Sequence, residues 1–136
     1  MAIQTLYRMI QDIKGTNTMR IHTGTGGMAV AQMLLSAHTP EVPVVDKQGR
    51  FVGHVGESEL LQVIESGREL RSVKVEDIMS RELHGVPETT PIETALSFMK
   101  KNRLLNLPVV ENGILIKTVS THDLLRAMVD AGLGLE

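Results

Sequence analysis

Two kinds of apolar pattern alternate along the chain: recurrences every three or four residues, and short continuous runs. The recurrence in residues 89–101 predicts a helix, with Thr90 as its N-cap and Pro91 at the first helical position. A looser recurrence in residues 26–38 predicts a matching helix in the first half of the chain. The apolar sides of these helices comprise Ile92, Ala95, Leu96 and Met99, and Met28, Ala31 and Leu35, respectively.

Each predicted helix is followed by two β-rich runs joined by a glycine turn, and then by a closing helix. The runs lie at residues 43–45 and 50–55 in the first half of the chain, and at 108–110 and 114–119 in the second. The closing helices carry Leu60, Leu61 and Ile64, and Leu124, Leu125 and Met128. The two halves of the chain therefore have the same order of predicted elements.

The halves also match in sequence. A shift of 65 residues aligns Pro43 with Pro108, and after a one-residue slip in the turn Val55 aligns with Val119. The sequence thus predicts two repeats, residues 1–70 and residues 71–136. Tyr7, Ile10 and Ile13 predict a short amphipathic helix at the start of the first repeat.

A repeat of this size is a marginal folding unit, because its small sheet exposes an apolar face that nothing covers. Two equivalent repeats can cover each other. We therefore expect an α/β protein in which each repeat has a two- or three-stranded sheet and two helices, and in which the repeats pair about a pseudo-two-fold axis. Small ligands tend to bind where such subdomains meet.

Composition narrows the function classes. The 136 residues carry a net charge of −2 and three aromatic side chains, which argues against binding to nucleic acid or to an anionic membrane. No apolar run approaches the ~18 residues of a membrane span. The absence of cysteine fits a reducing compartment. We therefore expect a cytoplasmic protein.

Four segments carry a family resemblance: "VEDIM", "TTPIETALSFM", "LPVVENG" and "VSTHDLL". Together they resemble the cystathionine-β-synthase (CBS) domain, and the doubled repeat resembles a CBS pair, or Bateman module. The resemblance implies a sensor that binds an adenosyl compound, namely AMP, ADP, ATP or S-adenosylmethionine, with no required cofactor. It also implies homodimers and regulation of another protein, whose identity the sequence does not indicate.

The resemblance assigns ligand-binding roles in the second repeat. Ser120 matches the residue that contacts phosphate, and Asp123 matches the carboxylate that holds the ribose hydroxyls. A carboxylate accepts from vicinal hydroxyls, and a helix N-terminus receives an anion. The other candidates for this site are Thr121, His122, Pro108, Val86 and Lys117. Ser120 and Asp123 are equally typical of a helix cap, which alone would explain both residues.

The first repeat departs from this pattern. Gly56 stands in place of the hydroxyl and Glu59 in place of the aspartate, so Gly56, Glu59 and Pro43 define a weaker second site. We expect one ligand per chain. The positions before each "PVV" hold Pro40-Glu41 and Leu105-Asn106 in place of basic residues; the available cations are His122, Lys117, Arg126 and Arg50. This favours AMP, adenosine or a sulfonium nucleoside over a triphosphate.

Other motifs are poorly supported. Gly24 to Ala29 imitates a dinucleotide-binding fingerprint, but the preceding residues make a poor buried strand. Ser120, His122 and Asp123 are too close along one helix start to form a catalytic triad. The histidines show no metal-ligand spacing. We therefore predict neither a catalytic nor a metal site, and no enzyme. The alternative to a ligand sensor is a CBS pair that dimerises or scaffolds without a ligand.

Overall fold

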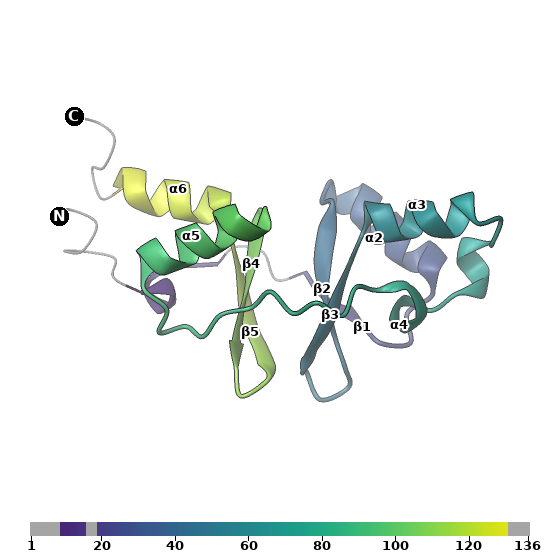
Figure 1. Cartoon of the computed structure of the whole chain (residues 1–136), viewed down its shortest axis with the longest axis horizontal. Coiled ribbons are helices and arrows are strands. Elements are labelled where there is room, and N and C mark those ends of the chain that lie inside the picture. Colours follow the sequence, from purple (N-terminus) through teal and green to yellow (C-terminus); the bar gives the residue numbers. More distant parts are fainter. Residues whose placement is uncertain (1–8, 16–18, 131–136) are drawn as a thin grey trace. The chain divides into compact units, whose positions relative to one another are not determined.

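The computed structural model describes residues 9–15 and 19–130, which form two compact units (Figure 1). Residues 19–83 make up the first, which we call the continuous unit. Residues 84–130, together with residues 9–15 from near the start of the chain, make up the second, which we call the split unit. Each unit has a hydrophobic core of its own.

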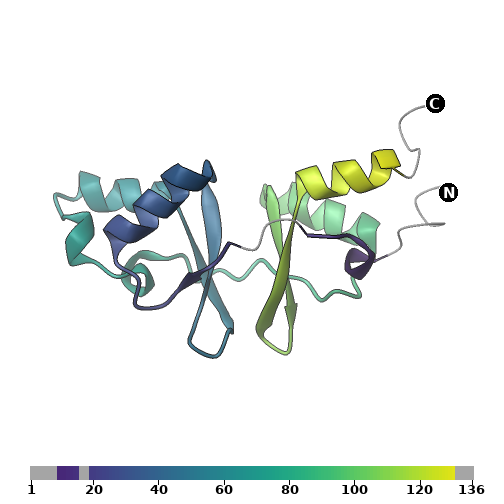
Figure 2. The same ribbon diagram turned by 180° about the vertical axis from the view of Figure 1, so that it is seen from behind.

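The continuous unit contains a three-stranded sheet in the order β1-β2-β3, with β1 parallel and β3 antiparallel to the central strand. Its elements are β1 (Ile21–His22), α2 (Gly27–Ala37), β2 (Glu41–Val45), β3 (Phe51–Gly56), α3 (Glu57–Glu65), the short 3-10 helix η2 (Leu70–Ser72) and α4 (Val75–Ile78). Helices α2 and α3 pack together beside the sheet (Figure 2). Val30 and Leu34 of α2 and Leu60 of α3 meet the strand residues Val44 and Val55 in its core.

The split unit repeats this plan. Its elements are the 3-10 helix η1 (Ile10–Asp12), α5 (Ile92–Asn102), β4 (Asn106–Glu111), β5 (Ile114–Ser120) and α6 (Thr121–Asp130). Strands β4 and β5 are antiparallel. Val86 forms a parallel bridge to Val109, as Ile21 of β1 does to Val44 in the continuous unit. A single bridge therefore stands in place of the third strand.

Backbone irregularities recur at equivalent positions. The register of both hairpins shifts immediately after Val44 and after Val109. Helices α2 and α5 both end at a left-handed residue that is not glycine, His38 at φ 52° and Arg103 at φ 54°. The predicted repeat of a small sheet and two helices is thus confirmed as an α/β fold. The pairing of the repeats about a pseudo-two-fold axis stays a prediction.

The two repeats have exchanged their leading segments. Ile10 and Ile13, which begin the chain's first repeat, are buried in the core of the split unit. Val75 and Met79, which begin the second repeat, are buried in the core of the continuous unit. The compact units therefore do not coincide with the predicted repeats of residues 1–70 and 71–136.

Equivalent backbone hydrogen bonds hold the exchanged segments in place. The Ile10 N–H donates to the Thr90 carbonyl at 2.9 Å, and the Val75 N–H donates to the Thr25 carbonyl at 2.8 Å. These contacts place each leading segment beside the helix that starts the other repeat's core. The apolar side chains of each segment are buried there, which stabilises the exchanged arrangement.

Three local predictions need correction. Pro91 itself is the N-cap of α5, because the Thr90 hydroxyl turns away and donates to the Pro87 carbonyl at 2.6 Å. The buried side of α2 is formed by Gly27, Val30 and Leu34, one residue before the predicted positions, and Leu35 is 69% exposed. Where an amphipathic helix was predicted around Ile10 and Ile13, the described residues form the 3-10 helix η1, and Tyr7 lies outside the described residues.

Candidate ligand site

Ser120 and Asp123 lie where β5 passes directly into α6, and they cap that helix reciprocally. The Ser120 N–H donates to Asp123 Oδ2 at 2.9 Å, and the Asp123 N–H donates to Ser120 Oγ at 3.0 Å. Asp123 is 3% exposed. The arrangement is a capping box, in which two N–H groups that the helix leaves without partners are satisfied by two side chains. Capping therefore accounts for both residues as they stand.

Thr121 and His122 follow on the exposed first turn of α6. The Thr121 N–H donates to the Leu105 carbonyl at 3.0 Å, which ties the helix start to the loop before β4. His122 Nε2 lies 2.8 Å from the Arg126 guanidinium, one turn further along. Since the imidazole faces Arg126 and the Asp123 carboxylate faces the Ser120 N–H, these residues do not form a catalytic triad.

Pro108 and Val86 lie next to each other through backbone hydrogen bonds. The Val86 N–H donates to the Pro108 carbonyl at 3.1 Å, and the Val86 carbonyl accepts from Val110 N–H at 2.9 Å. Both side chains are buried, and Pro108 sits opposite Thr118 of β5. The structure thus brings these two predicted residues together on the β4 side of the split unit.

Lys117 is engaged elsewhere. Its ammonium group donates to the Ile13 carbonyl at 2.8 Å and contacts the Gln11 carbonyl at 3.5 Å. These carbonyls belong to the exchanged leading segment. The side chain thus attaches this segment to β5. It therefore has less capacity to bind a phosphate, which was the role considered for it from the sequence.

The weaker predicted site has the same layout in the continuous unit. The Gly56 N–H donates to Glu59 Oε1 at 2.7 Å, so half of the capping box persists without a hydroxyl. Pro43 is buried in β2 and pairs with His54. A Cβ on Gly56 would lie 2.6 Å from the Pro40 carbonyl oxygen, which is closer than side chains tolerate. The glycine is therefore required by a close backbone approach.

An ion pair lies beside this weaker site. His54 Nδ1 of β3 is 3.0 Å from Glu41 Oε2 of β2. The hydrogen bond with Glu41 raises the pKa of His54 against the opposing effect of burial, and the charges of Glu59 and Glu82 raise it further. The continuous unit therefore favours a cationic imidazole at this point.

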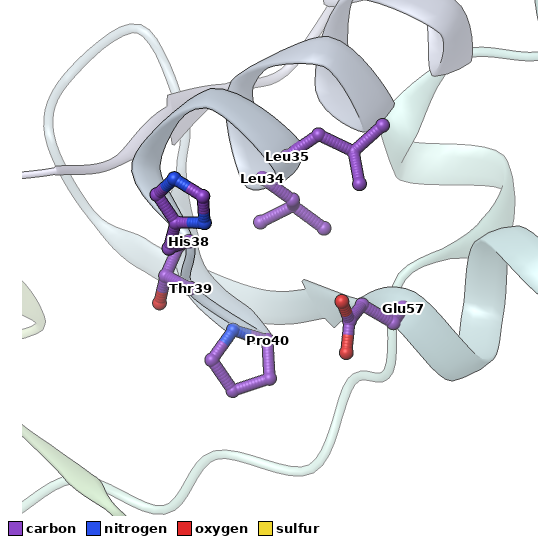
Figure 3. Close-up of a pocket in the computed structure, with 6 residues that line it drawn as sticks. All are labelled: Leu34, Leu35, His38, Thr39, Pro40 and Glu57. Atoms are coloured by element: carbon purple, nitrogen blue, oxygen red, sulfur yellow. The ribbon is translucent and has the colours of Figure 1, made fainter.

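A cavity of about 300 Å³ opens at the same end of the continuous unit (Figure 3). It is lined by Leu34, Leu35, His38, Thr39, Pro40 and Glu57. Figure 3 shows the Glu57 carboxylate pointing from the start of α3 toward the cavity, opposite the ring of Pro40. None of the six lining residues was among the predicted site residues; Pro40 was noted only because it stands where a basic residue would meet phosphate.

The glycine-rich loop before α2 does not act as a phosphate cradle. The Gly24 N–H donates to Glu76 Oε1 at 2.8 Å, and the Gly27 N–H donates to the Val73 carbonyl at 2.9 Å. A carboxylate thus occupies a loop N–H that a dinucleotide would need. Ile21 and His22 do form a short parallel strand, contrary to the sequence argument, but the loop serves to hold the α4 segment.

Within residues 9–15 and 19–130, no group of three or more histidine, aspartate or glutamate side chains is arranged to hold a metal ion. None of the helices within these residues is long and apolar enough to cross a membrane.

Comparison with known sequences identifies relatives for most of the chain. The family model of the CBS domain matches residues 75–130. An uncharacterized 17.7 kDa protein of Acidianus ambivalens is 38% identical over 88 residues, which are 64% of this chain and 52% of that protein. The mitochondrial CBS domain-containing protein CBSX3 of Arabidopsis thaliana is 34% identical over 101 residues, 70% of this chain and 49% of that protein. The chain spans about half the length of these relatives.

Solved structures share the fold. A CBS domain pair in complex with 5′-methylthioadenosine and S-adenosyl-L-methionine has a TM-score of 0.72 at 21% identity, covering 90% of this chain and 96% of the other. A CBS-domain-containing protein of Agrobacterium tumefaciens has a TM-score of 0.73 at 22% identity, covering 91% and 96%. At these identities the likeness concerns the fold, and it covers both repeats.

Proposed function

We infer that this chain, whose residues 75–130 match the CBS domain and whose fold is that of CBS domain pairs, is a tandem CBS domain pair, and we propose that it is a regulatory module that binds an adenosyl ligand at the β5–α6 junction. Ser120, Thr121 and Asp123 would hold the ribose and the group attached to its 5′ carbon, and Val86 and Pro108 would flank the base. We infer that the module is not an enzyme and that it transmits ligand occupancy to a partner protein in trans.

The observation that carries this proposal is the reciprocal pair of Ser120 and Asp123 at the start of a ten-residue helix. A carboxylate has about four lone-pair positions, so Asp123 can accept from ribose hydroxyls while it keeps the Ser120 N–H. The hydroxyl of the exposed Thr121 would then lie beside the 5′ group. The same residues thus serve both as cap and as ligand site.

The charges favour a ligand with little or no phosphate. Lys117 donates to Ile13, and Leu105 and Asn106 stand where a basic residue would meet phosphate. No such cation is needed by S-adenosylmethionine, 5′-methylthioadenosine or adenosine. AMP, with a single phosphate, depends on a basic residue less than ATP does. The structural neighbour that holds 5′-methylthioadenosine and S-adenosyl-L-methionine supports this class of ligand.

Thermal unfolding with these compounds tests the proposal. A ligand at about a hundred times its dissociation constant stabilises the folded state by about 2.7 kcal/mol, which raises Tm by several degrees. We expect a shift with an adenosyl compound, a smaller shift with ATP, and one bound ligand per chain by calorimetry. Flat melts across the whole series would contradict ligand binding.

Asp123→Asn separates ligand binding from capping. The amide keeps an oxygen that can accept the Ser120 N–H, so the variant retains most of its stability. It loses the anionic acceptor for the ribose hydroxyls, so we expect the ligand-induced shift to disappear. Asp130→Asn, at the far end of the same helix, is the matched control and keeps the shift.

Self-association is the second candidate function, with or without a ligand. Several large apolar side chains on the helices are exposed, including Leu35 at 69%, Leu61 at 55% and Leu125 at 63%. Clusters of this kind mark interaction surfaces in proteins that remain in solution. A chain that dimerises but gives flat melts with all adenosyl compounds would fit this function.

A further inference from the structure

We propose that the His54–Glu41 pair closes the weaker site of the continuous unit to an adenosyl ligand, so that the split unit alone binds one. The proposal rests on the proposed function and deepens it, because it names the side chains that restrict the chain to one ligand. Its basis is the repeated fold, in which the same place on the sheet carries the pair in one unit and smaller side chains in the other.

The registers of the two hairpins establish which residues are equivalent. Cross-strand pairs near the closing helices are Glu41 with Gly56 and Pro43 with His54 in the continuous unit, and Asn106 with Ser120 and Pro108 with Thr118 in the split unit. Asn106 thus stands where Glu41 stands, and Thr118 stands where His54 stands. An amide and a hydroxyl in the split unit are therefore replaced by a carboxylate and an imidazole in the continuous unit.

Pro43 and His54 lie on the face of the sheet that points away from the core. Successive residues of a strand point to opposite faces, and Val42, Val44 and Val55, which neighbour these two residues along the strands, are buried in the core. Side chains directly opposite each other on antiparallel strands have Cβ atoms about 4.5–5.5 Å apart. The imidazole of His54 therefore lies beside Pro43.

The ion pair directs the ring toward the start of α3. Glu41 Oε2, which lies 3.0 Å from His54 Nδ1, belongs to the residue opposite Gly56, the N-cap of α3. The charge of Glu59, in the first turn of α3, also raises the pKa of His54, so the ring lies within electrostatic reach of that residue. The ring thus lies between the proline at one end of the weaker site and the helix cap at the other.

An adenosyl ligand needs this stretch to be clear, because its base and its ribose are joined directly. In the site proposed for the split unit, Pro108 would flank the base and Asp123 would hold the ribose, with Thr118 between them. A threonine side chain ends at its hydroxyl and methyl groups, whereas the ring of His54 extends to the carboxylate of Glu41. Because the His54 side chain is only 18% exposed, the pair fills the equivalent stretch.

Displacing the ring would be unfavourable. The carboxylates of Glu41, Glu59 and Glu82 all attract it, and Glu41 also holds it by a hydrogen bond. A ligand that moved the ring aside would separate these opposite charges. The backbone beneath the ring is fixed as well, since His54 and Ser80 exchange two N–H to carbonyl hydrogen bonds of 3.0 and 2.8 Å.

Calorimetric titration of the whole chain with 5′-methylthioadenosine, S-adenosyl-L-methionine and AMP, each in turn, tests the closure. We expect wild type to bind one ligand. Glu41→Asn with His54→Thr copies the side chains of the split unit and should bind a second ligand. This ligand should bind about ten- to a hundredfold more weakly than the first, because Gly56 offers no hydroxyl.

Two further variants complete the test. His54→Ala removes the ring alone and should also bind a second ligand, which keeps the closure testable if the double variant does not fold. Asp46→Asn with Arg50→Thr is the matched control. It removes another ion pair of the same hairpin, 2.9 Å between Arg50 Nε and Asp46 Oδ2, which lies at the turn. This control should bind one ligand, as wild type does.

The outcomes separate the closure from the proposed function. One ligand in wild type and still one in the opened variants would overturn the closure and leave the proposed function intact. Two ligands in wild type, or a second ligand in the ion-pair control, would also overturn the closure. A wild-type chain that binds none of the three compounds would overturn the proposed function and the closure with it.

Discussion

The ammonium group of Lys117 donates a hydrogen bond to the carbonyl oxygen of Ile13, 104 positions earlier in the chain, at 2.8 Å. The contact lies inside the split unit and fastens the exchanged leading segment to β5. A lysine considered from the sequence as an available cation for a ligand's phosphate thus has a structural role. Its contribution to folding and its contribution to binding can be measured separately.

Replacing Lys117 with methionine keeps the aliphatic stem and removes the donor. A hydrogen bond from a charged group contributes about 1.5–3 kcal/mol, so we expect a loss of that order in the free energy of unfolding, measured by urea denaturation. Lys101→Met, on the exposed end of α5, is the control and should change stability by less than about 0.5 kcal/mol. The ratio of AMP to adenosine affinity should not change. A selective loss of AMP binding would show that Lys117 contacts the phosphate of the ligand.

Gly56→Ser copies the hydroxyl of the second repeat into the first. Because its Cβ would lie 2.6 Å from the Pro40 carbonyl oxygen, the backbone must shift, at a cost of about 1–3 kcal/mol. Gly26→Ser is the matched control, since Gly26 is also a helix N-cap and has nothing within 4 Å of its Cβ position. We expect it to be neutral or slightly stabilising. A stable Gly56→Ser protein that binds two ligands would refute this account.

The His54–Glu41 pair makes stability depend on pH. The pKa of His54 is raised in the folded state, so the stabilisation is fully present below its unfolded value of about 6.5 and is lost as pH rises through the raised value. Glu41→Gln removes the main partner. The difference in unfolding free energy between wild type and variant should therefore be larger at about pH 6 than at about pH 9. An NMR titration of the ring should show its pKa falling in the variant; an unchanged pKa would contradict the pairing.

The exchange of leading segments predicts which core each segment supports. Ile10 is fully buried, so Ile10→Ala should destabilise by about 2–5 kcal/mol. Hydrogen exchange should show faster opening of α5 and α6 in the split unit, whereas Val75→Ala should affect α2 and α3 in the continuous unit. The reverse assignment would show that the segments pack within their own repeats.

Much of this fold could be predicted from the sequence, because the signals are local. The "PVV" strands, the glycine turns and the α5 pattern each lie within a few residues. The buried side of α2 could not be chosen, since Met28, Ala31, Leu34 and Leu35 make the helix apolar over most of its circumference. Periodicity therefore supported two adjacent faces almost equally.

The features that escaped prediction depend on contacts distant in sequence. The pattern shows that Ile10 is apolar, but it does not show which repeat will bury it. The partner of Lys117 and the obstacle at Gly56 belong to segments that only the folded chain brings near. The capping roles of Ser120 and Asp123 were local, and the reciprocal hydrogen bonds confirm them.

The exchanged leading segments also bear on how the protein is made. The continuous unit needs nothing beyond residue 83, so it can fold on the ribosome as soon as that stretch emerges. The split unit must wait for the β4–β5 hairpin and α6, while Ile10 and Ile13 remain without their core through most of synthesis. During that interval the split unit of a completed neighbouring chain offers the same core, so exchange of the leading segment between chains is the misassembly that we expect.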